Sequence, residues 1–484
     1  MTIPLLPGDP HDEALARAVR PPDWVNPSPA ERYHLVVIGG GPAGLVCAAG
    51  AAALGARVAL IERDLLGGDC LNVGCVPSKA LLRAAKAAAE LRRAGRYGVH
   101  VPATAIDFPA VMRRVRQVRA ELAPADSAER FRSLGVDLFR GEGRFLSDHS
   151  VGVNGAVLRF SRCVIATGSR PRVPDLPGLA ACRWYTNETI FTLTELPGRL
   201  LILGGGLIGC EFGQAFARLG SRVTLVARSG TLRTLGPEAT AAAHAALTAD
   251  GVDIVADVPD VADFRHFDAV LVATGRAPNV EGLNLDAAGV RLDTTGGIAV
   301  DDHLRTSNPR VFAAGDVCSV GQRFTHTADA MARTALRNAL FPLQARWSTL
   351  TIPWCVYTDP EIAGVGLSRA EAAARGIAVD EFRCDLSSVD RAATEGTEGF
   401  VTVLVKKGTD RLLGALAVGP TAGELIGTLA LAIGQRVGLK TLASTVFPYP
   451  TYTEVLRKLG DRYNRTRLTP TARCLLGWWL RLFR

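Results

Sequence analysis

The sequence has no long apolar run. No window reaches the roughly 18 apolar residues that a membrane-spanning helix needs, and residues 1–32 hold several prolines and charges but no apolar core like that of a signal peptide. We therefore expect neither a spanning helix nor a secretory signal, with the cytoplasm as the default location.

Clusters of basic residues with interleaved aromatics are missing as well. The formal net charge is +8, with 55 Lys and Arg against 47 Asp and Glu, but the basic residues are scattered along the chain. A nucleic-acid-binding surface would gather them. We expect no nucleic-acid partner, and phosphate-rich cofactors explain the positive bias better.

Regular cysteine spacing is absent except at one place. Ten cysteines in 484 residues fit a reducing compartment in which most remain thiols. The exception is GGDCLNVGCVPSK, residues 67–79, where two thiols could close a small disulfide ring and reopen it on receiving two electrons. Two alternatives stay open: Cys70 and Cys75 are a pair of buried core cysteines, or they are two ligands of a metal site.

The residues after Cys75 favour a helix start. Pro77 and Ser78 are typical of the first helical positions, and we expect a helix to begin near Lys79. Because a helix N-terminus favours negative charge, a thiolate at Cys75 would be stabilised there.

The length predicts roughly three domains, and an apolar strand followed by glycines identifies the first. The strand YHLVVI leads into Gly39, Gly41 and Gly44, and then come an Ala-rich helix and a second strand that ends at Glu62. The glycines allow a tight turn and close approach to a pyrophosphate at the helix N-terminus, while the acid can bind ribose hydroxyls. This pattern is typical of a dinucleotide-binding fold.

The glycine pattern repeats without its acid. The strand RLLIL leads into Gly204, Gly206 and Gly209. The position that matches Glu62 is Ala227, followed by Arg228. A carboxylate would repel the 2′-phosphate of NADP and an Arg can pair with it, so we expect NADPH rather than NADH. An Arg also follows the acid in the first glycine pattern, where Arg63 comes after Glu62. The missing acid is therefore better evidence for NADPH than the presence of Arg228.

Residues 67–79 resemble the redox-active signature of the class I pyridine nucleotide-disulfide oxidoreductases, the flavoenzyme family of glutathione reductase, dihydrolipoamide dehydrogenase and mercuric reductase. The resemblance extends from about Tyr33 to about Pro470, with the motifs in the family's order. Asp69 departs from the family, which usually carries a small Thr there, and the sequence gives no physical account of it.

The resemblance implies an α/β fold with two Rossmann-like dinucleotide-binding domains, for FAD and for NAD(P)H, and an α+β C-terminal dimerisation domain in a homodimer. The implied segments are an N-terminal arm (1–32), an FAD-binding domain in two parts (33–175 and 296–345), an NAD(P)H-binding domain (176–295), a dimerisation domain (350–470) and an amphipathic tail (471–484). We expect the arm to be extended and either to wrap the body or to stay mobile.

Site roles also follow from the resemblance. Cys75 would be the thiolate that faces the flavin and Cys70 the thiol that attacks substrate, while Lys79 and Glu211 match an ion pair beside the flavin ring. Further residues that match cofactor-binding motifs are Gly68, Thr167, Gly168, Gly275, Gly315 and Asp316. Of these, Asp316 would accept a hydrogen bond from a ribitol hydroxyl, and Gly315 would allow close approach.

The segment FPYPTYTE, residues 447–454, indicates the substrate. Disulfide reductases carry a His there as proton shuttle, and relatives contribute this segment to the partner's active site. This chain has Tyr449, a poor base with a pKa of about 10, and retains Glu454. Mercuric reductase also has a Tyr here, and Hg(II) needs soft ligands, transiently Cys70 and Cys75, more than a proton shuttle. One feature argues against mercuric reductase. Those enzymes end in a vicinal Cys-Cys pair that passes the metal inward, whereas this tail has one cysteine, Cys474.

The leading hypothesis is an NADPH-dependent, mercuric reductase-like flavoprotein that acts on Hg(II) or a related small thiol-bound substrate. One alternative is a dihydrolipoamide dehydrogenase or other small-disulfide reductase, and another is a non-catalytic flavoprotein redox sensor or electron carrier. The tail ARCLLGWWLRLFR combines aromatic and basic residues, so it would make weak membrane contact or dock on its own protein.

Overall fold

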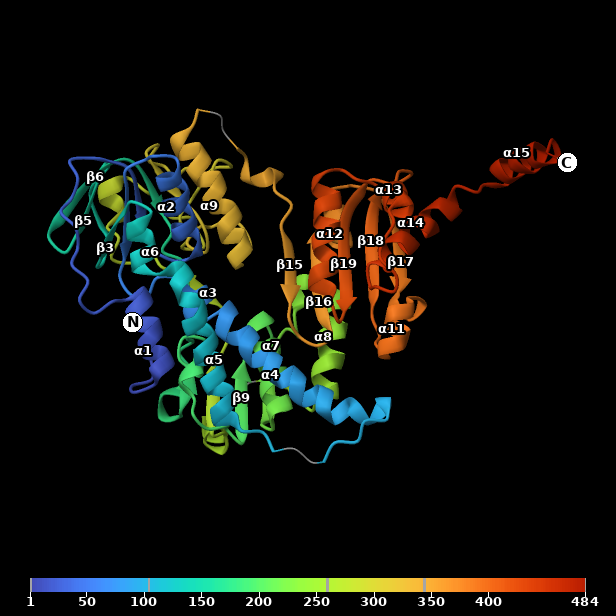
Figure 1. Cartoon of the computed structure of the whole chain (residues 1–484), viewed down its shortest axis with the longest axis horizontal. Helices are drawn as coiled ribbons and strands as arrows, with labels where there is room; N and C mark the ends of the chain where they lie inside the picture. The colour runs from blue at the N-terminus through green and yellow to red at the C-terminus, as the bar shows by residue number, and fades with distance from the viewer. Residues whose placement is uncertain (1, 103–104, 258–260, 343–344, 484) are drawn as a thin grey trace. The chain divides into compact units, whose positions relative to one another are not determined.

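The computed structural model describes residues 2–102, 105–257, 261–342 and 345–483. Its contacts divide the chain into two compact units (Figure 1): residues 1–230 with 250–350, and residues 231–249 with 351–484. The segment boundaries expected from the sequence stay predictions.

The first unit contains a seven-stranded sheet in the order β3-β2-β1-β6-β5-β4, with β14 paired to β6. Its strands are β1 (Tyr33–Ile38), β2 (Val58–Glu62), β3 (Val136–Arg140), β4 (Arg144–Ser147), β5 (Ser150–Val153), β6 (Ala156–Ile165) and β14 (Val311–Ala313). The pairs β1–β2, β1–β6, β2–β3 and β6–β14 are parallel. The central strand β1 buries five of its six residues, as expected for a strand covered on both faces.

Two helices cover this sheet side by side, α2 (Pro42–Ala53) and α9 (Thr325–Leu340). Alanines and glycines dominate α2, and small residues let helices approach closely. A Cβ on Gly50 would lie 2.6 Å from the side chain of Leu336 on α9. The Ala-rich sequence of α2 therefore serves close helix packing as well as helix propensity.

A second, fully parallel sheet follows within the same unit, in the order β11-β10-β9-β12-β8. Its strands are β8 (Trp184–Tyr185), β9 (Arg199–Leu203), β10 (Arg222–Val226), β11 (Asp253–Val255) and β12 (Ala269–Val272), with α7 (Leu207–Leu219) after β9. An antiparallel ribbon of β7 (Ser169–Pro171) and β13 (Arg276–Pro278) joins the two ends of this segment. The α/β fold with two nucleotide-type sheets is confirmed.

Further helices of this unit include the two that carry the cysteines, α3 (Gly68–Asn72) and α4 (Cys75–Arg93), and also α5 (Phe108–Leu122) and α6 (Ala128–Ser133). The expected helix start near Lys79 was wrong, because α4 already begins at Cys75. Pro77 fits inside the first turn, where backbone N–H groups have no partner within the helix.

The N-terminal arm was expected to be extended and either to wrap the body or to stay mobile, and the structure differs from this in its conformation. It contains the helix α1 (Pro10–Val19), and the Asp9 side chain accepts hydrogen bonds from the backbone N–H groups of residues 11 and 12. Leu15 and Val19 are buried in the core of the first unit. An N-cap acid followed by Pro at the first position is a sufficient helix signal, and the two apolar residues attach the helix to the body.

The second unit is an antiparallel sheet with helices, in the order β15-β16-β19-β18-β17. Its strands are β15 (Pro353–Val356), β16 (Glu361–Gly366), β17 (Val379–Asp385), β18 (Phe400–Lys406) and β19 (Leu412–Gly419). Its helices are α8 (Pro237–Ala249), α10 (Arg369–Ala374), α11 (Asp390–Glu395), α12 (Ala422–Gly434), α13 (Leu439–Ser444), α14 (Glu454–Thr466) and α15 (Pro470–Arg481). Residues of the inner strands and of α12 to α14 form its core, whereas α15 buries none.

Candidate active site

The two cysteines lie on consecutive helices at the edge of the first glycine turn. Cys70 is in the single turn of α3 and Cys75 is the first residue of α4. Gly68 adopts a φ of 54°, and a Cβ there would lie 2.7 Å from the Cα atom of Gly41. Glycine is therefore required for the cysteine loop to approach the first glycine fingerprint, the strand, turn and helix that contain Gly39, Gly41 and Gly44.

The two thiols have different acidities. The pKa of Cys75 is lowered to about 6, mainly by a hydrogen bond from Cys70 and also by Thr325, at 3.1 Å from the sulfur, and Lys79, against the effect of desolvation. The same hydrogen bond, with burial, raises the pKa of Cys70. The negative charge of the pair thus resides on Cys75.

Neither thiol belongs to the hydrophobic core. Cys70 is half-buried and Cys75 is exposed, so the alternative of two buried core cysteines is wrong. Thr325, at the start of α9, was missed by the sequence prediction because its approach to Cys75 joins residues 250 positions apart.

The expected ion pair between Lys79 and Glu211 is present. Lys79 Nζ on α4 lies 2.8 Å from Glu211 Oε2 on α7, and the Glu211 side chain is 8% exposed. Lys79 stands one helical turn after Cys75, so the structure brings both cysteines and the ion pair to one end of α4. Their catalytic roles stay a prediction.

The first fingerprint fits the ADP half of a dinucleotide. A Cβ at Gly44 would lie 1.8 Å from the Gly39 carbonyl oxygen, so the helix and the turn pack too closely for any side chain at residue 44. No side chain caps the N-terminus of α2 after Gly41, which leaves its backbone N–H groups for a phosphate. The Glu62 carboxylate accepts hydrogen bonds from the N–H groups of Gly40 and Asp64, both at 2.6 Å. These residues fit bound FAD.

The second fingerprint repeats this geometry with one difference. A Cβ at Gly209 would again lie 1.8 Å from the carbonyl oxygen of the first glycine, Gly204, and the space beside Gly206 is open. A Cβ at Gly205 would meet the methyl group of Ala227 at 2.6 Å, whereas the equivalent Gly40 faces the Glu62 side chain. Ala227 therefore occupies the place of the ribose-binding acid, and Arg228 is exposed beside it.

Asp69 has a partner that the sequence did not reveal, Arg276 on β13. The two side chains form an ion pair, and Arg276 Nε donates to Ser169 Oγ at 2.7 Å. Ser169 Oγ in turn donates to Asp316 Oδ2 at 2.7 Å. The guanidinium compensates the unusual carboxylate, and the network links the start of α3 to the expected ribitol-binding acid. Sequence reasoning missed this partner because the two residues are 207 positions apart.

The remaining matched residues lie around this network. Thr167 Oγ1, just before β7, donates to the carbonyl oxygen of Asn279, just after β13, at 2.7 Å. This bond joins the two segments that enter and leave the second sheet. Gly168, Gly275 and Gly315 all have positive φ, at 68°, 134° and 81°. Glycine is therefore the favoured residue at each of these turns.

Tyr449 and Glu454 belong to the second unit. The Tyr449 hydroxyl is exposed and donates to Asp390 Oδ2 at 2.6 Å, and this bond raises the pKa of Tyr449. Glu454, at the start of α14, is paired with Lys458 at 3.1 Å and with Arg457 at 3.5 Å. Their expected place at the partner's cysteines stays a prediction.

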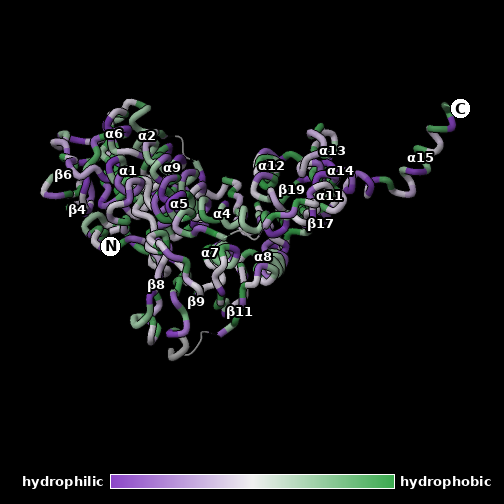
Figure 2. Tube along the Cα trace, turned by 60° about the horizontal axis from the view of Figure 1, so that its bottom comes forward, coloured by the Kyte–Doolittle hydropathy of each residue, from purple (hydrophilic) through white to green (hydrophobic). Residues whose placement is uncertain are grey.

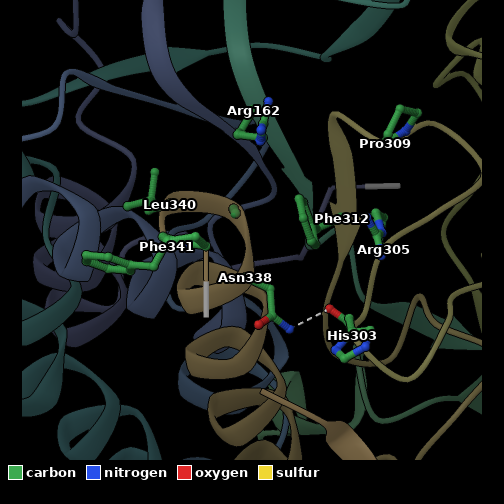
Figure 3. Close-up of a pocket in the computed structure, with 10 residues that line it drawn as sticks. Arg162, His303, Arg305, Pro309, Phe312, Asn338, Leu340 and Phe341 are labelled. Carbon is green, nitrogen blue, oxygen red and sulfur yellow. Dashed lines mark hydrogen bonds between the residues drawn. The ribbon is translucent and has the colours of Figure 1, made fainter. Parts of the chain in front are cut away.

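A separate cavity of about 330 Å³ lies in the first unit, between the C-terminal end of α9 and the strand β14 (Figure 3). Arg162, His303 and Arg305 are among its lining residues, and Asn338 donates to the backbone carbonyl of His303 at 2.8 Å. None of the residues that line it belongs to the predicted site.

Comparison with known families agrees with this geometry. Residues 33–332 match the family described as pyridine nucleotide-disulphide oxidoreductase, and residues 352–459 match the dimerisation domain of that family. The chain belongs to this family. Its members use FAD and a pyridine nucleotide, the chain is an enzyme of this oxidoreductase class, and the dimerisation domain supports a homodimer.

Similar proteins of the family differ in substrate. The chain is 38% identical to a mercuric reductase of Acidithiobacillus ferrooxidans, over 90% of this chain and 83% of that protein. It is 34% identical to a dihydrolipoyl dehydrogenase of Chlamydia muridarum, over 88% of this chain and 95% of that protein. The solved structure of LpdA from Mycobacterium tuberculosis has a TM-score of 0.80 at 27% identity, covering 89% of this chain and 99% of the other.

Another solved structure is a Cu(II) complex of the HOCl-induced flavoprotein disulfide reductase RclA from Escherichia coli. Its TM-score is 0.77 at 26% identity, over 89% of this chain and 99% of the other. Within the described residues, no helix of this family member is long and apolar enough to cross a bilayer.

Proposed function

We propose that this enzyme passes two electrons from NADPH, through FAD and the Cys70–Cys75 pair, to thiol-bound Hg(II), which leaves as Hg(0). The observation that carries the proposal is the polarised thiol pair, in which Cys75 holds the charge at the start of α4, one turn before the Lys79–Glu211 ion pair. FAD, when bound, accepts hydride from the nicotinamide and transfers two electrons onward.

The chemistry of Hg(II) suits a proton on Cys70. Hg(II) arriving as a complex of two small thiolates exchanges them for the sulfurs of Cys70 and Cys75. The proton of Cys70 passes to one leaving thiolate, so no separate base is required. The two sulfurs then give two electrons to Hg(II) and form the Cys70–Cys75 disulfide, so both Hg–S bonds break and mercury leaves as Hg(0). NADPH supplies the two electrons that reduce this disulfide again and becomes NADP⁺.

Tyr449 supports a metal-ion substrate over a disulfide. Cleavage of a disulfide substrate leaves a thiolate that needs a proton, and relatives with that activity supply it from a His at this position. The hydrogen bond to Asp390 raises the pKa of Tyr449, which makes the phenol a weaker acid for this purpose.

Ala227 supports NADPH as the coenzyme. The Glu62 carboxylate, which can hold ribose hydroxyls, is replaced by a methyl group at the second fingerprint. A 2′-phosphate would meet no carboxylate there, and the exposed Arg228 offers a charge-assisted hydrogen bond.

An anaerobic titration tests the function. The purified holoenzyme is reduced with NADPH, and Hg(II) with excess thiol, oxidised lipoamide and glutathione disulfide are then added separately. We expect long-wavelength absorbance from the Cys75 thiolate beside the flavin to appear with NADPH and to disappear with Hg(II) alone. If a disulfide abolishes this absorbance and Hg(II) leaves it unchanged, the protein is a small-disulfide reductase instead. No absorbance with NADPH would point to a non-catalytic flavoprotein.

We further propose that α15 contacts an anionic lipid surface. Arg473, Gly477 and Arg481 recur every four residues and so share one face of α15. The other positions present exposed Leu475, Leu476, Trp478, Trp479 and Leu480. Both hydrophobic and hydrophilic residues are visible along α15 in Figure 2, and no acidic residue follows Asp461. A basic face beside a wide apolar face with tryptophans favours an interfacial helix.

Sedimentation with vesicles tests this contact. We expect the full chain to bind vesicles that contain phosphatidylserine and to bind phosphatidylcholine vesicles less, while a chain that ends at Pro470 binds neither. Equal partition of the two chains would contradict the proposal. A dimer that dissociates without the tail would show that α15 docks on a second copy.

A further inference from the structure

The peptide between the two cysteines is held by a buried arginine. Arg119 on α5 donates from Nη1 to the backbone carbonyl oxygen of Asn72 at 2.8 Å, and its side chain is 2% exposed. Asn72 is the last residue of α3, so this carbonyl has no partner within the helix. A cation at a helix C-terminus is electrostatically favourable. Arg119 therefore caps the turn that carries Cys70.

This turn needs support from outside. The helix α3 has five residues, far below the length at which a helix is stable alone. The side chain of Asn72 gives part of this support, because its Nδ2 donates to the carbonyl oxygens of Leu66 at 3.0 Å and Gly68 at 2.8 Å. Asn72 is thus the residue through which both the start and the end of α3 are fixed.

Arg119 is in turn held by the N-terminal arm. Its guanidinium forms an ion pair with Asp12 on α1, whose side chain is 3% exposed. A buried guanidinium is costly without a carboxylate partner, so Asp12 determines whether Arg119 stays at the Asn72 carbonyl. The matched family segment begins at residue 33, and Asp12 lies before it.

The arm also reaches the loop after β2. The backbone N–H of Ile3 donates to Asp64 Oδ2 at 2.6 Å, Arg20 pairs with Asp64 Oδ1 at 2.6 Å, and the N–H of Leu66 donates to the Val19 carbonyl oxygen at 3.2 Å. The N-terminal arm therefore also fixes the loop that joins Glu62 to the turn that carries Cys70.

We propose that Asp12 and Arg119 are positioning residues for the redox pair, which keep the Cys70 turn in the orientation that presents its thiol to Cys75. This inference rests on the redox role of the pair given under Proposed function. Loosening α3 would let Cys70 withdraw from Cys75, and Cys75 would lose the hydrogen bond that stabilises its thiolate.

The chain supplies a matched control on the same helix. Arg116, one turn before Arg119, is also buried and pairs with a carboxylate of the arm, Asp9, at 2.7 Å. Unlike Arg119, it makes no hydrogen bond to α3 among those found in the described part of the chain. Arg119→Gln and Arg116→Gln therefore both break a buried ion pair between α1 and α5, and Arg119→Gln alone removes the cap.

The experiment measures thiol reactivity in the reduced holoenzyme. The variants are treated with iodoacetamide from pH 5 to 9, and alkylation of Cys70 and Cys75 is followed separately by mass spectrometry. We expect Arg119→Gln to slow Cys75 alkylation near pH 5 about tenfold, which corresponds to a rise of one unit in the pKa of Cys75. Arg116→Gln should lower the unfolding temperature and leave the titration of Cys75 unchanged.

Conservative variants cover the case in which Arg119→Gln does not fold. Arg119→Lys keeps a charge beside Asp12 without the planar fork that also reaches Asn72, so it should still shift the titration, whereas Arg116→Lys should not. Equal titrations in all variants would overturn the proposal. A wild-type enzyme whose cysteines are not reduced by NADPH would instead contradict the proposed function and leave the capping role to be judged by alkylation after chemical reduction.

Discussion

Lys79 Nζ lies 2.8 Å from Glu211 Oε2, and this ion pair acts on Cys75 in opposite directions. Lys79 lowers the pKa of Cys75 and Glu211 raises it. Lys79→Met should therefore raise the pKa of Cys75, and Glu211→Gln should lower it, each by about one unit or less.

The pH titration of the long-wavelength absorbance in the NADPH-reduced enzyme measures both shifts. Arg83→Met is the control, because Arg83 lies one turn further along α4 and is exposed. Shifts in the same direction for Lys79→Met and Glu211→Gln would contradict this account.

The redox pair should respond to pH below neutrality. The pKa of Cys75 falls from 9.0 to about 6 in the folded protein, so its thiolate is present above pH 6 and is protonated as the pH falls through 6. We expect the long-wavelength absorbance to be constant from pH 7 to 9 and half lost near pH 6. Because the folded-state pKa is the lower one, this thiolate stabilises the reduced fold at high pH and less so as the pH falls.

The Cys70→Ala variant removes the largest of the three causes of this acidity and leaves Thr325 and Lys79 in place. Cys70 gives the largest lowering of the Cys75 pKa, so the absorbance of Cys70→Ala should titrate at higher pH than that of the wild type. The variant should still be reduced by NADPH and should lose turnover of Hg(II). Turnover at the wild-type rate would mean that Cys70 is not the substrate thiol.

Replacing Tyr449 by His should add disulfide reduction. A His with a pKa near 6.5 can protonate a leaving thiolate, and general acid catalysis contributes about 10²–10⁴-fold. We expect Tyr449→His to raise kcat/KM for oxidised lipoamide by at least about tenfold while Hg(II) reduction changes little. Tyr449→Phe is the control, since it removes the hydroxyl that bonds Asp390 without adding a base.

Restoring the acid of the second fingerprint should change the coenzyme. Ala227→Glu would place a carboxylate where Glu62 stands in the first fingerprint, which repels a 2′-phosphate and can bind ribose hydroxyls. We expect the ratio of kcat/KM for NADPH to that for NADH to fall about tenfold or more. Arg228→Ala should lower the NADPH value and leave the NADH value, and equal losses with both coenzymes would contradict a role at the 2′-position.

Local patterns in the sequence predicted the glycine turns, because each fingerprint is a strand, a turn and a helix in direct succession. The ion pair of Lys79 with Glu211 was predicted only through the family resemblance, since it joins two helices. The Asp69–Arg276 and Arg119–Asn72 contacts were missed for the same physical reason. They depend on how distant segments pack, and no periodicity or spacing encodes that.

The N-terminal helix was missed for a different reason. Its N-cap Asp9 and the following Pro10 were visible in the sequence, but the prolines and charges around them, without sustained periodicity, favoured an extended arm that wraps the body or stays mobile. In the structure, Asp9 and Asp12 of the arm form buried ion pairs with Arg116 and Arg119 on α5. A charged segment is therefore not a reliable sign of mobility when complementary charges lie elsewhere in the chain.

The antiparallel ribbon of β7 and β13 brackets the segment that we propose binds the coenzyme. The chain leaves the first sheet through β7 and returns through β13, and the two strands pair residue for residue from Ser169 with Pro278 to Pro171 with Arg276. Both ends of the inserted sheet are thus fixed side by side. A segment of another family member grafted between these two points should exchange coenzyme preference as a unit, and it would have to keep an acid at the position of Glu211, because α7 lies within the segment and Glu211 acts on the pKa of Cys75.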